Sequence, residues 1–324
     1  MADFSKSRIC TLLGIRRPIF QGGMAWIATP ELAAAVSEAG GLGILTSVWE
    51  TVEQFRDHLR RIRQKTTRPF GVNLMLRHPG TAEIARIVAE ERVPVVTTGA
   101  GDPQPYMASW LAADIRIIPV VSSVGYARLM ERRGAAAVIA EGTEAGGHIG
   151  TTSTLCLVPQ VVDAVKIPVV AAGGIGDGRG MAAAFMLGAE GIQMGTRFLA
   201  ARECDIHRRY KEKLLQARDT GTVVTGGRYG RPIRSLKTPF SVLMAELEGN
   251  GSCAAPQYAE LGAGALKRAV ASGDLEKGCF MAGQIAGLIR KEQSAGDILD
   301  EVEGQAAALM GPYMAKRALF DEYT

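Results

Sequence analysis

The stretch 138–150, VIAEGTEAGGHIG, combines an apolar run, a glycine-rich loop and a single imidazole. The apolar run breaks at Gly142, and Gly146 and Gly147 then place His148 at the tip of a loop. Paired glycines let the backbone come close to a planar ligand, because no Cβ stands in the way. Histidine is the side chain most easily tuned for proton chemistry near neutral pH. The pattern therefore indicates a catalytic site, and its alternative is an ordinary strand-to-helix turn with a surface histidine.

Short apolar runs alternate with helical segments from residue 17 onward and must position this loop. The runs are apolar throughout, as is typical of parallel strands covered on both faces. The predicted strands are 18–21, 42–45, 70–74, 93–97, 115–120, 136–140, 168–172 and 191–194. The predicted helices between them are 31–39, 52–64, 82–91, 126–133, 157–165 and 180–187. Eight βα units predict a (β/α)₈ TIM barrel, with a doubly wound open sheet as the alternative.

The regular rhythm stops after the eighth predicted strand. Residues 200 to about 278 hold charged helical text, the turn-rich piece TGTVVTGGRYGRP and a Gly/Ala-rich segment. We interpret this stretch as a smaller inserted lid domain that contacts substrate. Residues 1–199 and about 279–324 would then form the barrel and its closing helices.

Composition and charge exclude several classes of protein. A hydrophobic share of 47% with 22% charged residues is ordinary for a soluble globular protein and gives no reason to expect disorder. The net charge of +4 is too small to imply nucleic-acid binding by itself. The five cysteines form no CxxC pair, which excludes the usual zinc spacings, so no metal is expected. No secretory signal or long uncharged apolar run is present, so the expected location is the cytoplasm, with no membrane contact.

The loops that follow the predicted strands are rich in glycine, and barrel active sites lie at these strand ends. Strands seven and eight lead into Gly173-Gly174 and Gly195-Thr196. Bare backbone N–H groups there, with the Thr196 hydroxyl and a helix N-terminus, can bind a phosphate dianion. Together with the glycines after strands one and six, these loops indicate a flat, phosphate-bearing cofactor such as FMN. The GxGxxG of a dinucleotide fold is absent from the first turn, which disfavours a Rossmann site.

Several motifs resemble those of the flavin-dependent, class II enoyl-acyl-carrier-protein reductases, which share a superfamily with the nitronate monooxygenases (2-nitropropane dioxygenases). They are FQGGMAW, PFGVN, VVTTGAG, EGTEAGGHIG, IPVVAAGGIGDGRG, QMGTRF and, near the end of the chain, MAGQIAGLI. The resemblance implies a barrel with non-covalent FMN that NADH or NADPH reduces, and an enoyl thioester as hydride acceptor in fatty-acid synthesis. A nitronate monooxygenase and an NADH:quinone reductase remain alternative activities, as does a flavin-binding protein without turnover.

The resemblance also assigns roles to residues. His148 matches the catalytic histidine of both branches of the superfamily. The next residue is commonly Arg in nitronate monooxygenases, whereas here it is Ile149, which favours the reductase. The implied flavin contacts and pocket residues are Gly22, Gly23, Met24, Asn73, Glu141, Gly146, Gly147, Gly173, Gly174, Gln193, Met194, Gly195 and Thr196. The resemblance leaves the oligomeric state open, with a homodimer as one option.

A basic segment lies in the predicted lid. Between residues 220 and 245 the chain has four basic residues, Arg228, Arg231, Arg234 and Lys237, and no acidic one. We interpret this excess as a surface for an acidic acyl carrier protein, which complementary charge would steer. A solvated loop and a site for a nucleotide phosphate are the alternatives.

Overall fold

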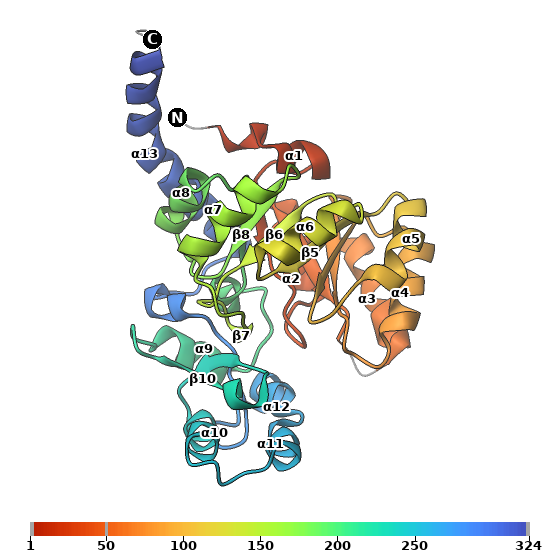
Figure 1. The fold of residues 1–324 in the computed structure, drawn as a ribbon, viewed down its shortest axis with the longest axis vertical. Helices are drawn as coiled ribbons and strands as arrows, with labels where there is room; N and C mark the ends of the chain where they lie inside the picture. The colour runs from red at the N-terminus through yellow and green to blue at the C-terminus, as the bar shows by residue number, and fades with distance from the viewer. Residues whose placement is uncertain (1–2, 49–50, 322–324) are drawn as a thin grey trace.

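The computed structural model describes residues 3–48 and 51–321 and contains a closed parallel barrel (Figure 1). The strand order is β1-β2-β3-β4-β5-β6-β8-β9, and β1 closes the barrel by pairing with β9 in parallel. The strands are β1 (Ile19–Gln21), β2 (Leu42–Thr46), β3 (Phe70–Met75), β4 (Val95–Gly99), β5 (Arg116–Val121), β6 (Val138–Glu141), β8 (Val169–Ala172) and β9 (Gly191–Met194). The (β/α)₈ prediction is confirmed, the open-sheet alternative is wrong, and each predicted strand lies within about two residues of an observed one.

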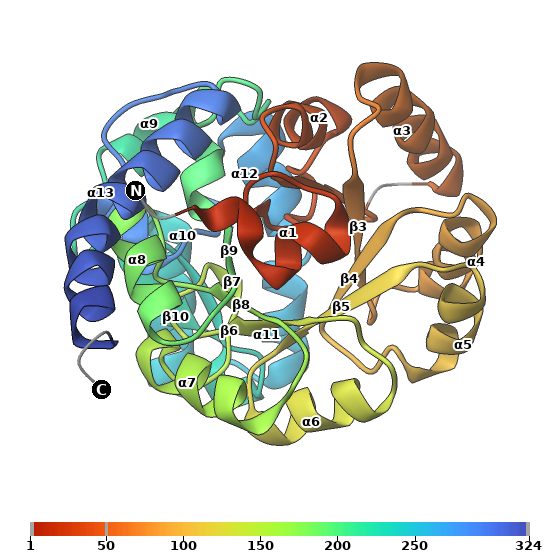
Figure 2. The same ribbon diagram turned by 90° about the horizontal axis from the view of Figure 1, so that it is seen from above.

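Helices surround the strands as an outer ring (Figure 2). They are α2 (Pro30–Glu38), α3 (Val52–Lys65), α4 (Thr81–Glu90), α5 (Gln104–Ala112), α6 (Val124–Arg132), α7 (Thr154–Ala164) and α8 (Gly178–Met186). Local capping sets their starts: Thr29 accepts a hydrogen bond from the Leu32 amide, and Asp177 accepts from two amides of α8. The sequence did not predict α5, since only Met107 and Trp110 of that helix are buried and no clear apolar stripe results.

The two ends of the barrel differ. Apolar side chains such as Phe20, Ile44 and Ile139 fill its interior, and they join Ile9 and Leu13 of α1 (Arg8–Leu13) in one cluster. Viewed from above, α1 lies across the barrel (Figure 2). One end is therefore plugged, which leaves the carboxyl ends of the strands for a site.

Residues 208–272, which we call the cap segment, form a second lobe beside the barrel (Figure 1). Its elements are α9 (Arg208–Leu215), β10 (Thr222–Thr225), η3 (Gly227–Tyr229), β11 (Ile233–Leu236), α10 (Pro239–Gly249), α11 (Ala255–Gly262) and α12 (Ala265–Ser272). Strand β11 pairs with β10 and also, antiparallel, with β7 (Gly147–His148) of the barrel loop. Backbone hydrogen bonds therefore connect the loop after β6 to the cap segment.

The chain returns from the cap segment through η4 (Gln284–Leu288) to α13 (Ala295–Asp321), which packs along α8. Among the described residues, no helix is both long and apolar enough to cross a membrane.

Candidate active site

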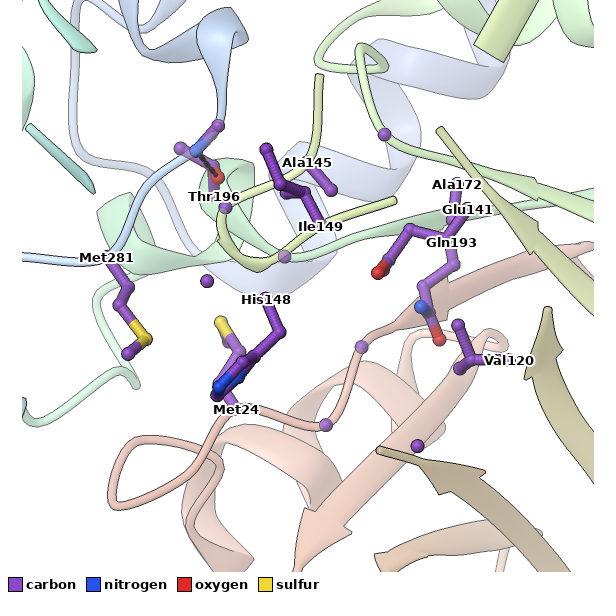
Figure 3. A pocket seen from close by; sticks show the side chains of 18 of the residues that line it. Met24, Val120, Glu141, Ala145, His148, Ile149, Ala172, Gln193, Thr196 and Met281 are labelled. Carbon is purple, nitrogen blue, oxygen red and sulfur yellow. Dashed lines mark hydrogen bonds between the residues drawn. The ribbon is translucent and has the colours of Figure 1, made fainter. Parts of the chain in front are cut away.

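A cavity of about 380 Å³ opens at the carboxyl ends of the barrel strands (Figure 3). Every site residue predicted from the sequence lines it, from Gly22 after β1 to Thr196 after β9. The sequence did not single out several other lining residues: Met75, Ser122, Glu144, Leu266, Met281 and Ile285. Met75 is the last residue of β3 and Ser122 directly follows β5, and this position at a strand end is a signal that could have found them. Leu266 comes from the distant cap segment, where no local pattern marks it, and Met281 begins the motif MAGQIAGLI, to which the sequence assigned no role in the site.

Several glycines of the pocket are required by protein packing. A Cβ on Gly23 would lie 2.2 Å from Cβ of Asn73, and one on Gly22 would lie 3.1 Å from the Gln193 side chain. A Cβ on Gly146 would lie 2.6 Å from the backbone of Ala282. These glycines let loops approach one another, which is a packing role beyond the access for a planar ligand that the sequence indicates.

The corner between β8 and β9 has the donors that a phosphate requires. Gly174 adopts φ +70°, and 3-10 helix η2 (Thr196–Ala200) begins directly after β9. In the described chain, the backbone N–H groups of Gly174, Gly195 and Thr196 donate to no turn or loop acceptor. Free amides at a helical N-terminus suit a dianion. The Thr196 hydroxyl oxygen accepts from the Gly283 amide at 2.8 Å, which leaves its proton for a ligand.

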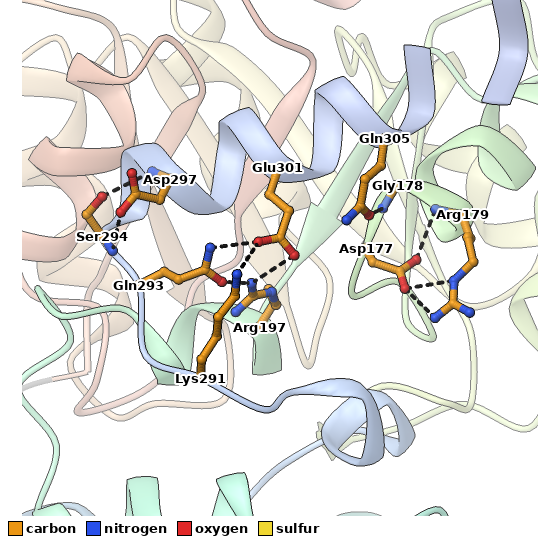
Figure 4. Close-up of polar contacts among 10 residues, drawn as sticks. All are labelled: Asp177, Gly178, Arg179, Arg197, Lys291, Gln293, Ser294, Asp297, Glu301 and Gln305. Atoms are coloured by element: carbon orange, nitrogen blue, oxygen red, sulfur yellow. Dashed lines mark hydrogen bonds and ion pairs between the residues drawn. The ribbon is translucent and has the colours of Figure 1, made fainter. Parts of the chain in front are cut away.

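Helix α13 holds this corner in place (Figure 4). The side-chain oxygen of Gln305 accepts from the Gly178 amide at 3.0 Å, at the start of α8. Buried Arg197 of η2 donates to Gln293, and its guanidinium lies 3.8 Å from a carboxylate oxygen of Glu301. These contacts hold both loops of this corner in place.

Glu141 and Gln193 line the inner part of the cavity (Figure 3). Neither side chain hydrogen-bonds to another described residue, so both remain available to a ligand. Burial raises the pKa of Glu141 to about 7. Asn73, also in the lining, donates to the Thr97 hydroxyl at 3.0 Å and keeps its carbonyl oxygen free. The free donors and acceptors of the cavity match the polar edge and phosphate of FMN, so the residues present fit that cofactor.

His148 stands at the other side of the cavity, near its mouth, with an exposed side chain (Figure 3). The sequence predicted His148 at the tip of a loop, and this was wrong. The residue belongs to the short strand β7, where it lies opposite Ile233 of β11. Desolvation by the surrounding protein, and then repulsion from Arg77 and Arg231, lowers the pKa of His148. The imidazole is therefore mainly neutral at neutral pH and can donate a hydrogen bond into the cavity.

The prediction that Arg234 belongs to an exposed basic surface is wrong. Arg234 is only 8% exposed, and its guanidinium donates to the Thr143 carbonyl at 3.1 and 3.2 Å and to the Thr222 hydroxyl at 3.3 Å. It faces inward because β11 pairs with β7, and it braces the loop that bears His148. Arg228, Arg231 and Lys237 are exposed, as a carrier surface requires.

Comparison with known proteins gives consistent similarities. The family model for nitronate monooxygenase matches residues 6–91 and 81–303. FabK from Thermotoga maritima has 48% sequence identity, a TM-score of 0.93, and coverage of 96% of this chain and 99% of its own. A probable nitronate monooxygenase from Staphylococcus aureus is 33% identical over 293 residues, covering 76% of this chain and 82% of its own. A carboxyl-CoA dehydrogenase of an octahydroindene substrate from Rhodococcus jostii is 37% identical over 247 residues, covering 76% and 69%.

Proposed function

The chain belongs to the nitronate monooxygenase family, and from this premise we propose that it is an FMN-dependent reductase of trans-2-enoyl thioesters with NADH or NADPH as reductant. The similarity to FabK, an enoyl-acyl-carrier-protein reductase II, carries the proposal. It exceeds the similarity to the probable nitronate monooxygenase in both identity and coverage. The similarity to a CoA-linked dehydrogenase supports a thioester in the same cavity.

Different residues of the cavity would bind the cofactor and act on the substrate. Gly174, Gly195 and Thr196 would hold the FMN phosphate, while Glu141, Gln193 and Asn73 would hydrogen-bond the rest of the cofactor. Bound FMN would supply hydride transfer from reduced nicotinamide to the β-carbon of the enoyl thioester. His148 would donate a hydrogen bond to the thioester oxygen, where negative charge grows during that transfer.

Nitronate oxidation is the alternative, and Ile149 argues against it. The neighbour of His148 is apolar, and an arginine at that place would bring a cation to a small anionic substrate. Arg234 does not replace it, because its guanidinium is committed to Thr143 and Thr222.

Anaerobic reduction followed by re-oxidation tests the proposal. We expect the purified protein to be yellow, to bind about one FMN per chain, and to be reduced by NADH or NADPH. Crotonyl thioesters should then re-oxidise the flavin without oxygen. A protein that cannot bind FMN would contradict the entire assignment. Efficient oxidation of nitronate with oxygen, together with no re-oxidation by any enoyl thioester, would establish the monooxygenase instead.

Thr196→Ala is expected to weaken FMN binding by about 1–2 kcal/mol, which is the scale of one hydrogen bond to a charged group. The substitution removes the hydroxyl donor and also the acceptor for the Gly283 amide. Fluorescence titration of the FMN-free protein measures the change. Thr196→Ser keeps the hydroxyl and is the matched control. Equal affinities of the wild type and Thr196→Ala would remove Thr196 from the phosphate site.

A carrier protein would meet the exposed basic residues of the cap segment. We expect turnover of an enoyl-carrier-protein substrate to fall steeply with added salt, because surface charge is screened within about 8–10 Å. Turnover of a short enoyl thioester without carrier should change little. The double variant Arg228→Glu/Lys237→Glu should raise KM for the carrier-bound substrate and spare kcat. A matching salt response for both substrates would argue against a carrier surface here.

A further inference from the structure

Two exposed arginines from different parts of the chain lie close in sequence to residues that line the cavity. Arg77 lies two residues beyond Met75, a lining residue, in a turn fixed by the hydrogen bond from the His78 amide to the Met75 carbonyl at 2.9 Å. Arg231 belongs to the cap segment and precedes Pro232, whose carbonyl accepts from the Ile149 amide at 3.2 Å. The backbone therefore brings both residues close to the lining of the cavity, one from the barrel and one from the cap segment.

Both arginines are free to bind an anion. Within the described ranges, neither guanidinium forms an ion pair or a hydrogen bond, whereas Arg8, Arg61 and Arg133 on the barrel surface all have acidic partners. Both act electrostatically on the His148 imidazole, so each of them lies near that side chain. An anionic ligand that reaches both guanidinium groups would gain charge-assisted hydrogen bonds from each.

This pair of arginines is separate from the predicted FMN phosphate corner. That corner is built from backbone amides after β8 and β9, and Glu144 and Thr196 lie there. The arginines come instead from the β3 loop and the segment before β11. The anion they receive therefore belongs to a molecule that enters through the mouth.

We propose that Arg77 and Arg231 form a phosphate-binding pair whose ligand is the pyrophosphate of the nicotinamide dinucleotide reductant. This inference rests on the proposed function, because it requires NADH or NADPH to reduce the bound flavin. In a nicotinamide dinucleotide the phosphate lies one ribose away from the reacting ring, so it stays near the mouth when the ring reaches the flavin. In a phosphopantetheine thioester a long amide chain separates the phosphate from the thioester, which carries that phosphate farther out. Arginine suits the task because its planar guanidinium binds phosphate through two parallel hydrogen bonds.

Anaerobic stopped-flow reduction of the FMN-loaded protein tests this pair. Arg77→Ala and Arg231→Ala should each raise the apparent Kd for NADH or NADPH about tenfold or more, as expected when one charge-assisted hydrogen bond is lost. The limiting reduction rate should stay nearly unchanged, because neither arginine contacts the reacting ring. Arginine-to-lysine variants should recover part of the affinity. Arg132→Ala removes the same charge from the end of α6, away from the cavity, and should behave like the wild type.

Reductants and acceptors with and without phosphate identify the source of the anion. The phosphate-free reductant 1-benzyl-1,4-dihydronicotinamide should reduce every variant with the same concentration dependence. Titration of the oxidised proteins with ADP-ribose, followed by the flavin absorbance, should show the same loss of affinity without any turnover.

The contrary outcomes distinguish a failure of this inference from a failure of the proposed function. Unchanged Kd values for NADH, NADPH and ADP-ribose in both alanine variants would overturn the inference alone. If crotonyl-CoA then lost affinity while crotonyl-N-acetylcysteamine did not, the pair would serve the thioester's phosphate. A wild-type flavin that neither NADH nor NADPH reduces would overturn the proposed function as well.

Discussion

Replacing His148 with Ala or Gln is expected to leave FMN bound and to slow re-oxidation of the reduced flavin by an enoyl thioester about 10²-fold or more. The imidazole lines the cavity on the side away from Glu141 and Gln193, so we expect it to face the thioester of a bound substrate (Figure 3). Loss of one oxyanion donor typically costs about 2.7–4 kcal/mol of transition-state stabilisation. Single-turnover mixing of reduced protein with crotonyl thioester measures the effect directly.

The reductive half-reaction serves as an internal control for this variant. Reduction by NADH or NADPH places no negative charge on a thioester oxygen, so its limiting rate should change far less. His58→Gln, on α3 and outside the cavity lining, is the matched substitution that should leave both half-reactions intact. Unchanged re-oxidation in His148→Ala would reduce the residue to a structural element of β7.

The lowered pKa of His148 gives this half-reaction a predictable pH response. A histidine with a pKa below its ordinary value of 6.5 is already neutral at pH 7 and stays neutral as the pH rises. If the neutral ring donates the hydrogen bond, the re-oxidation rate should be flat between about pH 7 and 8. If the re-oxidation rate of the wild type fell between pH 7 and 8 and that of His148→Gln did not, the imidazolium would be required.

The barrel and the members of the site could be predicted because both follow from local rules. Parallel strands buried on both faces appear as continuous apolar runs, and barrel chemistry lies at their carboxyl ends. Reading the exit loops therefore found residues as distant as Gly22 and Thr196, which the closed barrel brings to one cavity.

The rest of the site depends on contacts between distant segments. The pairing of β7 with β11 joins His148 to Ile233, and no local pattern in either segment specifies that partner. The same pairing turned Arg234 inward, although its neighbours Arg231 and Lys237 are exposed. The sequence shows a basic segment, but only the register of β11 decides that Arg234 is turned away from solvent.

The environment of Glu141 leads to the other large effect, on stability. The ordinary pKa of a glutamate is 4.5, whereas burial raises that of Glu141 to about 7. The folded FMN-free protein therefore binds this proton more tightly than the unfolded chain does. The stability from this group is fully present below about pH 4.5 and is lost as the pH rises to about 7. The difference between the two pKa values corresponds to about 3 kcal/mol at most.

Glu141→Gln is expected to abolish the loss of stability at rising pH, because the amide has nearly the same shape as the carboxyl group and does not titrate. Relative to the wild type, the variant's free energy of unfolding should rise between pH 5 and 7 by about 2–3 kcal/mol and level off above pH 7. Urea unfolding of both FMN-free proteins at pH 5, 6, 7 and 8 measures it. Glu53→Gln, at an exposed position of α3, should run parallel to the wild type over the whole range.

The same carboxyl connects stability with cofactor binding. A neutral Glu141 can donate a hydrogen bond to the cofactor, and glutamine can donate as well, so Glu141→Gln should retain FMN. Glu141→Ala removes the donor and should bind FMN less tightly. Its free energy of unfolding should have the same pH dependence as that of Glu141→Gln. Parallel stability profiles for the wild type and Glu141→Gln between pH 5 and 8 would mean that water or a cation in the open cavity keeps the carboxylate charged near its ordinary pKa.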